Sequence, residues 1–375
     1  MRALRLLGEG RSFYHCISRV VDRRKVFEGR DKEVFRKIMR NLERFMGVRV
    51  VTYCLMDNHF HLLVEVPEPG SLPPLDEEQL RALLPLLHDS AAVETIEQEL
   101  DRAREQGDAA WQAEILERYE RRRGSLSYFL KELKQRVTLY MNKKLDRTGT
   151  LWEGRFKSLL VEGHELSLMT VAAYIDLNPV RAGLVEKPED YRWCGYAEAL
   201  SGTRAAKLAR RGLGVVLSEC LHDSELRTDW RRTHNRYRQF LYEEGEVREY
   251  ECDAEHTAPP SSTASASPRA SHRPATGPVL RPIRPGFASA EVEKVIRARG
   301  ALPLSEVLRH RVRYLSDGAV LGTGAFVDGI FEREKERGRA SPKRESGARE
   351  MQGASWGVLR VMRDLRKGVL GEPGE

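Results

Sequence analysis

The chain has few cysteines and no long apolar run. Its five cysteines are scattered along 375 residues, and no two of them form a Cys-x-x-Cys pair. An odd number of dispersed thiols argues against a disulfide framework or a zinc knuckle and favours a reducing compartment. The first residues lack the apolar core of a signal peptide, and no stretch has the length of a membrane span. The sequence therefore predicts a soluble, cytoplasmic protein without a membrane partner.

Aromatic residues are absent from residues 253–286. This segment contains seven prolines and five serines but no Phe, Tyr or Trp. Such a composition buries too little apolar area to fold, which predicts a disordered linker. The linker would separate a domain at 1–252 from a basic C-terminal extension at 287–375, which is predicted to be helical. Within the extension, residues 288–332 would form a small helical module, with a DNA-reading helix-turn-helix as an alternative, and residues 356–370 a basic helix.

Residues 12–66 have the pattern of a small α+β fold. Alternating aromatic and β-branched residues predict a strand at 12–21, and apolar residues at helical spacing predict a helix at 31–46. Two further strands are predicted at 48–55 and 59–66, joined by a short turn. Strand, helix, strand, strand is the start of an antiparallel sheet with helices packed on one face.

The next part of the chain is divided by charge. Residues 68–120 hold four basic and fourteen acidic residues and are predicted to be an acidic insertion, an antiparallel pair of helices broken near Asp89. Residues 121–157 hold eleven basic and three acidic residues, and include an amphipathic helix at 126–144. A glycine-punctuated loop then leads into a strand at 158–161. A stripe of basic residues beside the acidic insertion indicates a surface that binds a polyanion. The alternative, solvated helix faces of mixed sign, explains the acidic part better than the basic part.

The motif His59-Phe60-His61 lies at the start of the strand predicted at 59–66. Residues i and i+2 of a strand point to the same face, so the two imidazoles would lie side by side. Two neutral imidazoles can hold one divalent metal and leave positions open for other ligands and a substrate oxygen. The alternative is a pair of histidines satisfied by hydrogen bonds, and the motif alone does not decide between the two. A nucleotide hydrolase with a third histidine at position 63 is disfavoured, because Leu63 stands there.

A helix predicted at 166–177 supplies a second candidate group, Tyr174. Tyr174 and Asn178 are four residues apart and would share one helical face. A tyrosine hydroxyl can attack phosphorus when a metal polarises the phosphate and holds it in line. The side-chain oxygen of Asn178 is a hard ligand that suits Mg²⁺ or Mn²⁺. The alternatives are a packed core tyrosine and a helix-capping asparagine, but their joint occurrence with the two histidines favours a catalytic site.

With these residues in place, the sequence resembles the single-tyrosine HUH transposases, specifically the REP-associated tyrosine transposase (RAYT) branch. Four stretches within residues 12–200 carry the resemblance: Tyr53–Val66, Leu133–Tyr140, Gly149–Phe156 and Tyr174–Gly183. The resemblance implies a ferredoxin-like α+β fold and a nuclease that cuts single-stranded DNA beside hairpin-forming repeats. The acidic insertion and the chain after residue 253 lie outside the compact family core, so their roles do not transfer.

The resemblance also implies the roles of the site residues. His59, His61 and Asn178 would be the metal ligands, and Tyr174 the nucleophile, with Mg²⁺ or Mn²⁺ as the cofactor. Attack by Tyr174 would leave a 5′-phosphotyrosine on the enzyme and a free 3′-OH, whose later attack would join a new junction. The expected partner is single-stranded DNA with hairpin-forming repeats, bound by a monomer or homodimer. The alternative is a non-catalytic regulator that binds hairpin DNA or RNA, and the intact histidines and tyrosine argue against it.

Basic and aromatic residues after position 130 are candidates for DNA contacts. They lie on the basic helix, in the loop after it and beside the tyrosine motif: Lys134, Arg136, Lys143, Lys144, Trp152, Arg155, Lys157 and Arg181. The cations would bind phosphates, and the Trp152 ring would stack on an unpaired base. An alternative is a tryptophan packed in the core, and for Arg181 a cap on the end of its helix.

Overall fold

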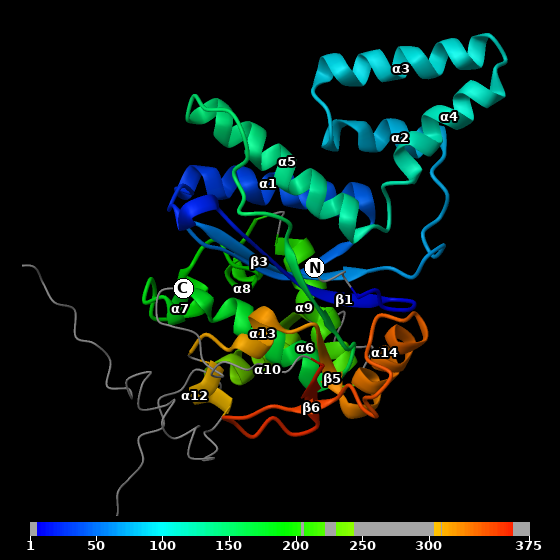
Figure 1. The fold of residues 1–375 in the computed structure, drawn as a ribbon. Coiled ribbons are helices and arrows are strands. Elements are labelled where there is room, and N and C mark those ends of the chain that lie inside the picture. The colour runs from blue at the N-terminus through cyan, green and yellow to red at the C-terminus, as the bar shows by residue number, and fades with distance from the viewer. Residues whose placement is uncertain (1–5, 204–205, 222–229, 244–303, 309, 363–375) are drawn as a thin grey trace, which may run out of the picture.

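Four strands and two helices form a β-α-β-β-α-β unit (Figure 1). The computed structural model describes residues 6–362 except 204–205, 222–229, 244–303 and 309. The unit consists of β1 (Ser12–Arg19), α1 (Gly29–Met46), β2 (Arg49–Leu55), β3 (His59–Val66), α5 (Leu126–Lys144) and β4 (Lys157–Val161). The strands lie in the order β2-β3-β1-β4 with antiparallel neighbours. This is the element order that the ferredoxin-like expectation requires.

The boundaries of these elements follow from local signals in the sequence. Glu28 and Asp31 form a capping box at the start of α1, and Gly47 ends the helix with a φ of 68°. The Ser125 side chain accepts a hydrogen bond from the Tyr128 N–H and so caps the start of α5. Both α5 and β3 begin and end at the predicted residues.

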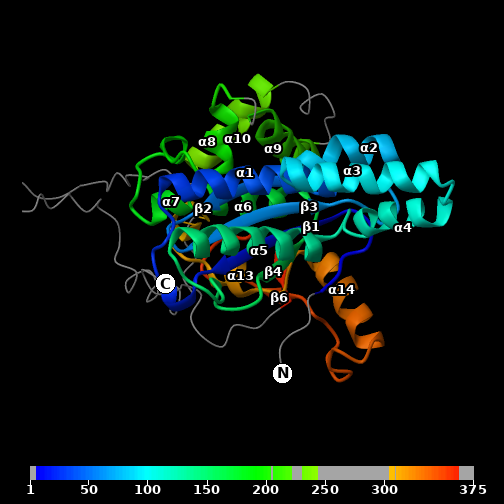
Figure 2. The same cartoon turned by 90° about the horizontal axis from the view of Figure 1, so that it is seen from above.

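Helices cover both faces of the sheet, so the expectation of helices on one face is wrong (Figure 1). Helices α1 and α5 pack on one face, and α6 (Glu165–Asp176) and α9 (Ala206–Leu221) pack on the other. Figure 2 views the sheet from the side that α1 and α5 cover. The reason lies in β3, where Leu62, Leu63 and Val64 are all buried. Leu62 and Val64 belong to the core under α1, and Leu63 belongs to the core under α6. A strand with consecutive apolar residues needs cover on both faces.

The remaining elements lie in the connections of the chain and beside α6. They are η1 (Val21–Arg23), α7 (Asn178–Arg181), η3 (Pro188–Asp190), α8 (Gly195–Leu200) and α10 (Trp230–Glu243). Within the described part of the chain, no helix combines the length and the apolarity that crossing a bilayer requires.

The acidic insertion forms a helical layer that projects beside α1 and α5 (Figure 1). It contains three helices rather than the predicted pair: α2 (Glu77–Leu83), α3 (Ser90–Glu105) and α4 (Ala109–Glu120), with the 3-10 turn η2 (Leu84–Leu86). The side chains of Asp76, Asp89 and Asp108 each accept a backbone hydrogen bond at the start of one helix. Three of the fourteen acidic residues of the insertion therefore also mark where its helices begin.

The C-terminal segment, residues 304–362 without residue 309, adds three strands to the sheet. It contains α12 (Leu304–Leu308), α13 (Arg313–Asp317), β5 (Val320–Thr323), α14 (Gly324–Glu336), β6 (Arg349–Glu350) and β7 (Leu359–Val361). Strand β5 pairs with β4 in parallel, and β7 and β6 follow in antiparallel order. The sheet is thus seven-stranded and mixed rather than antiparallel.

Two sequence expectations for this segment need correction. The extension is not purely helical, because the apolar residues Val320 and Leu321 pair with the strand edge that β4 would otherwise leave open. The helix expected at 356–370 is also wrong where the structure describes it, since Leu359–Val361 form a strand. Short apolar runs do not distinguish a strand from a helix by periodicity. The predicted linker at 253–286 lies outside the described residues.

Candidate active site

Three histidines from two neighbouring strands meet on the α6 face of the sheet. His59 and His61 lie on β3, and His15 lies on β1 opposite Leu63. The His15 and His61 rings stack with centroids 5.1 Å apart, and the His59 and His61 rings make an edge contact at the same distance. We call these three residues the imidazole cluster. The sequence placed His59 and His61 on one face, and the strand register adds His15 to them.

Hydrogen bonds fix which nitrogen of His61 carries a proton. Nδ1 of His15 lies 2.9 Å from the backbone oxygen of Leu315. A carbonyl oxygen only accepts, so this nitrogen is protonated. Burial lowers the pKa of His15 to about 4, so the ring is neutral and its Nε2 accepts a hydrogen bond from Nδ1 of His61 over 2.9 Å. This arrangement leaves the lone pair of His61 Nε2 available to a ligand.

His59 has the same tautomer for a different reason. Its Nδ1 lies 2.7 Å from Oδ1 of Asn58, whose amide nitrogen donates to the backbone oxygen of Arg23 over 2.8 Å. The Asn58 oxygen therefore accepts from His59, and Nε2 of His59 keeps its lone pair. Both histidines of the motif thus present the nitrogen that a metal needs, held by a hydrogen bond on the other side of the ring.

Both motif histidines are neutral at physiological pH. Burial, and then the positive charges of Arg19 and Arg311, lower the pKa of His59 to about 3. Burial lowers the pKa of His61 well below its ordinary value, and the neighbouring histidines add to the effect. A neutral imidazole is the form that ligates a metal. The donor set therefore fits a divalent cation.

Tyr174 lies on α6 against the imidazole cluster. Its side chain is 2% exposed, and its ring centroid is 6.1 Å from those of His15 and His61. The guanidinium of Arg181 lies 4.0 Å from the centre of the Tyr174 ring and donates to the Tyr174 backbone oxygen over 2.6 Å. The same guanidinium donates to the backbone oxygen of Leu308 over 3.0 Å. Tyr174 therefore lies near the histidines and in contact with a cation.

Asn178 does not continue the helix that carries Tyr174. Helix α6 ends at Asp176, and Asn178 is the first residue of α7, with Pro179 beside it. Leu177 between them keeps helical dihedral angles, so the chain turns without a break. Asn178 is 9% exposed. Its role as third ligand stays a prediction. Among the described residues, no three His, Cys, Asp or Glu side chains are placed to share a metal ion, so a third protein ligand here would be of another type.

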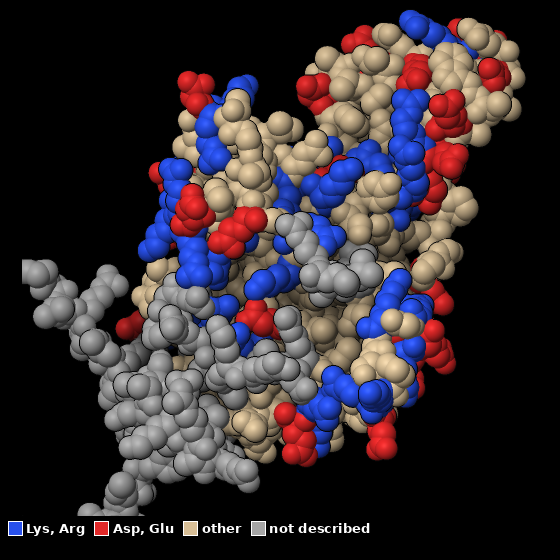
Figure 3. Space-filling model, in the orientation of Figure 1, with Lys and Arg blue, Asp and Glu red and all other residues tan. Residues whose placement is uncertain are grey.

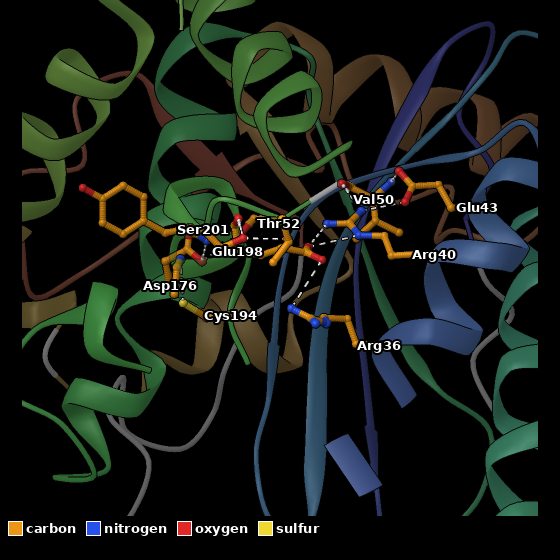
Figure 4. Close-up of polar contacts among 12 residues, drawn as sticks. Arg36, Arg40, Glu43, Val50, Thr52, Asp176, Cys194, Glu198 and Ser201 are labelled. Carbon is orange, nitrogen blue, oxygen red and sulfur yellow. Dashed lines mark hydrogen bonds and ion pairs between the residues drawn. The ribbon is translucent and has the colours of Figure 1, made fainter. Parts of the chain in front are cut away.

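Buried polar contacts anchor α6 and α8 at the β2 side of the sheet (Figure 4). Asp176 accepts a hydrogen bond from Thr52 on β2 over 2.8 Å. It also accepts one from Tyr237 on α10 over 2.5 Å. Nearby, the Glu198 carboxylate pairs with Arg40, which also binds Glu43 over 2.6 Å. Arg36 contributes a further ion pair to Glu198 at 3.8 Å. We call Arg36, Arg40, Glu43 and Glu198 the ion cluster. Because Asp176 follows Tyr174 by two residues, its contacts help to place the tyrosine.

The predicted DNA-contact residues occupy different environments. Lys143 and Arg155 are exposed. The other cations have partners, as Lys134 donates to the Gly154 oxygen, Arg136 to the Leu87 oxygen, Lys144 to Asp31 and Lys157 to Asp317. Figure 3 shows Lys and Arg side chains across the middle of one face, between the insertion and the C-terminal strands.

Trp152 lies in the hydrophobic core, as the alternative interpretation expected. Its ring contacts Phe27 and Phe60, and its Nε1 donates to Thr138 over 3.0 Å. Only 5% of the residue is exposed, so in this conformation its ring is covered by protein and is not free to stack on a base.

Sequence reasoning missed His15, Asn58 and the carbonyl group of Leu315. His15 belongs to the predicted first strand, and its alternation places it on one face of the sheet. A search for histidines on strands that neighbour the motif would have found it. No residue-type signal marks the Leu315 carbonyl, because every residue has one.

A comparison with family models supports the resemblance seen in the sequence. Residues 11–75 match the family model described as "Transposase IS200 like". A solved structure described as "Structure of the REP associates tyrosine transposase bound to a REP hairpin" is similar with 12% identity and a TM-score of 0.35, over 53% of this chain and 86% of that chain. A search of curated proteins found no match. The matched residues 11–75 include the whole imidazole cluster.

Proposed function

We propose that the protein is a metal-dependent nuclease and strand transferase that acts on single-stranded DNA at hairpin-forming repeats, through a tyrosine nucleophile. The observation that carries this proposal is the geometry of the imidazole cluster beside Tyr174. Two neutral imidazoles present their Nε2 lone pairs on one sheet face, and the Tyr174 ring centroid lies 6.1 Å from that of His61. The match of residues 11–75 to the family model described as "Transposase IS200 like" supports the same chemistry.

Each group has a role in the proposed reaction. His59, His61 and Asn178 would hold a divalent ion such as Mg²⁺ or Mn²⁺, which when bound withdraws charge from the scissile phosphate. The Tyr174 oxygen forms a bond to phosphorus as the bond from phosphorus to the 3′ oxygen breaks. The products are a 5′-phosphotyrosine and a strand that ends in a 3′-OH. Arg181 keeps Tyr174 in place by binding its backbone oxygen and stacking on its ring.

Cations on α5 and the loop after it would bind the DNA backbone. Lys143 and Arg155 are exposed and available to phosphates, while Lys144 and Lys157 would exchange a carboxylate partner for a phosphate. Arg181 acts within the protein, because its guanidinium already binds two backbone oxygens. We therefore propose Lys143 and Arg155 as the first residues of this set to contact DNA.

A second candidate function is a regulator that binds hairpin DNA or RNA without cutting it. The observation in its favour is the burial of Tyr174, which is 2% exposed. A scissile phosphate reaches the tyrosine only if the covering residues move. A binder needs no such movement.

The proposal is tested by trapping the covalent adduct on denaturing gels. Full-length protein would be mixed with labelled single-stranded hairpin oligonucleotides, including the repeats that flank its own gene, with Mg²⁺ or Mn²⁺. We expect an adduct that disappears with EDTA and with Tyr174→Phe, while Tyr174→Phe keeps its affinity for the hairpin. Tyr128→Phe on α5 is the matched control and should form the adduct. Hairpin binding without an adduct across the whole panel would support the regulator instead.

A further inference from the structure

The C-terminal segment reaches the imidazole cluster through a backbone carbonyl group. The oxygen of Leu315, on α13, accepts a hydrogen bond from Nδ1 of His15 over 2.9 Å. His15 is 300 residues away in sequence and 1% exposed. The other nitrogen of the same ring accepts from Nδ1 of His61 over 2.9 Å. A continuous chain of hydrogen bonds thus runs from α13 to a proposed metal ligand.

We infer that the C-terminal segment is part of the nuclease site, and that His15 is the positioning residue through which it orients His61. With the Leu315 oxygen as acceptor, His15 has one possible neutral tautomer, and that tautomer forces Nδ1 of His61 to be the donor. Nε2 of His61 then keeps its lone pair for the metal. The inference rests on the proposed role of His61 as a ligand.

A second contact from the same segment reaches the nucleophile. The Leu308 oxygen, on α12, accepts a hydrogen bond from Arg181, whose guanidinium lies 4.0 Å from the centre of the Tyr174 ring. The segment thus contacts both halves of the site, the histidine side through Leu315 and the tyrosine side through Leu308. Both contacts use backbone oxygens, so they depend on where α12 and α13 lie rather than on their side chains.

The position of α13 is fixed by tight packing against β4. Strand β5, which follows α13, pairs with β4, and Asp317 at the end of α13 binds Lys157 over 2.7 Å. At Gly318, a Cβ atom would meet the Tyr314 backbone oxygen at 2.4 Å and the Leu159 side chain at 3.0 Å. A side chain at position 318 would therefore displace the turn that carries Leu315. Gly329 on α14, in the same segment, has nothing within 4 Å of such an atom.

The first experiment measures Mn²⁺ affinity of the full-length protein, by electron paramagnetic resonance of free Mn²⁺. His15→Phe fills the site without a nitrogen and should weaken binding about 10- to 100-fold, as loss of a group that orients a ligand does. His15→Gln places an amide near the position of Nε2 and should restore most of the affinity. His15→Asn reaches only the Leu315 side and should not. Affinity for the hairpin in EDTA should be the same in all three variants.

The outcomes separate this inference from the proposed function. If the wild type binds no Mn²⁺, or if His61→Ala binds it as well as the wild type, the ligand role of His61 is wrong. If His61→Ala loses binding and His15→Phe keeps it, His61 remains a ligand and the positioning role of His15 is wrong.

The second experiment observes the tautomers directly, in long-range ¹⁵N–¹H spectra of protein labelled at histidine. Wild type should show Nδ1–H tautomers for His15 and His61. His15→Phe and Gly318→Ala should shift His61 toward the Nε2–H tautomer, and Gly318→Ala should also weaken Mn²⁺ binding. Gly329→Ala should change neither. A Gly318→Ala variant that folds, with the wild-type tautomer and Mn²⁺ affinity, would overturn the role of the C-terminal segment.

Discussion

The ion cluster and the imidazole cluster are both buried polar groups beside the same sheet, yet they differ in charge and in completeness. In the ion cluster, the two carboxylates face guanidiniums from α1. Burial by itself lowers the pKa of Arg40, but the carboxylates of Glu43 and Glu198 raise it above its ordinary value. The cluster keeps its charges because they compensate one another.

Among the described residues, no carboxylate contacts the imidazole cluster, which is neutral instead. Burial lowers the pKa of all three histidines, and each motif histidine uses one nitrogen for a hydrogen bond and makes none to a described residue with the other. A buried set of charges with its partners present is complete within the protein. A buried set of neutral donors with free lone pairs can be completed from outside, by a ligand. We therefore expect the ion cluster to contribute stability, and binding by the imidazole cluster stays a prediction.

The largest expected effect is the loss of stability when Glu198 is removed. Glu198→Ala leaves the buried Arg40 with one carboxylate instead of two. Breaking a buried ion pair by removing one partner costs about 3–5 kcal/mol. The free energy of unfolding would be measured in urea, with Glu99→Ala as control, because Glu99 pairs with Arg118 at the surface of the insertion. A loss of less than ~1 kcal/mol, the range of surface pairs, would contradict the structural role of the cluster.

The next effect concerns the pH dependence of stability. Burial raises the pKa of Asp176 to about 7, although hydrogen bonds from Tyr237, Thr52 and the Tyr196 N–H lower it in part. A carboxyl group with a raised folded-state pKa favours folding when protonated, so its contribution is complete below pH ~4 and is lost as pH rises toward 7. At about 1.4 kcal/mol per pKa unit, the loss is at most about 4 kcal/mol.

Asp176→Asn removes this titration and serves to measure it. The free energy of unfolding of the wild type minus that of the variant should fall as the pH rises from 4 to 7. Above pH 7 it should stay constant. Taking the difference cancels the titration of the other carboxylates. A difference that is flat over the whole range would mean that Asp176 is ionised in the folded protein throughout.

The sequence predicted the elements that carry local signals and missed those that depend on strand register. His59, His61 and Tyr174 could be proposed as candidates because spacing along one strand or helix is visible in the sequence. His15 was missed because its neighbours depend on the pairing of β1 with β3, which a sequence pattern does not specify. The contact of Leu315 with His15 joins residues 300 positions apart through a backbone oxygen. The strands β5 and β7 are too short for a period to distinguish them from helices.

The smallest effect on stability, and the sharpest test of the comparison, comes from His59. In EDTA, His59→Ala should lower the free energy of unfolding by only about 1 kcal/mol, because the neutral ring gives up one hydrogen bond to Asn58. With Mn²⁺ at about 100 times its dissociation constant, wild type should gain about 2.7 kcal/mol, and His59→Ala should gain nothing and form no adduct. His88→Ala, in the insertion, should respond to Mn²⁺ as wild type does.

Metal-dependent cutting by His59→Ala would remove His59 from the ligand set. A loss of several kcal/mol in EDTA would show that the imidazole cluster, like the ion cluster, holds the fold together.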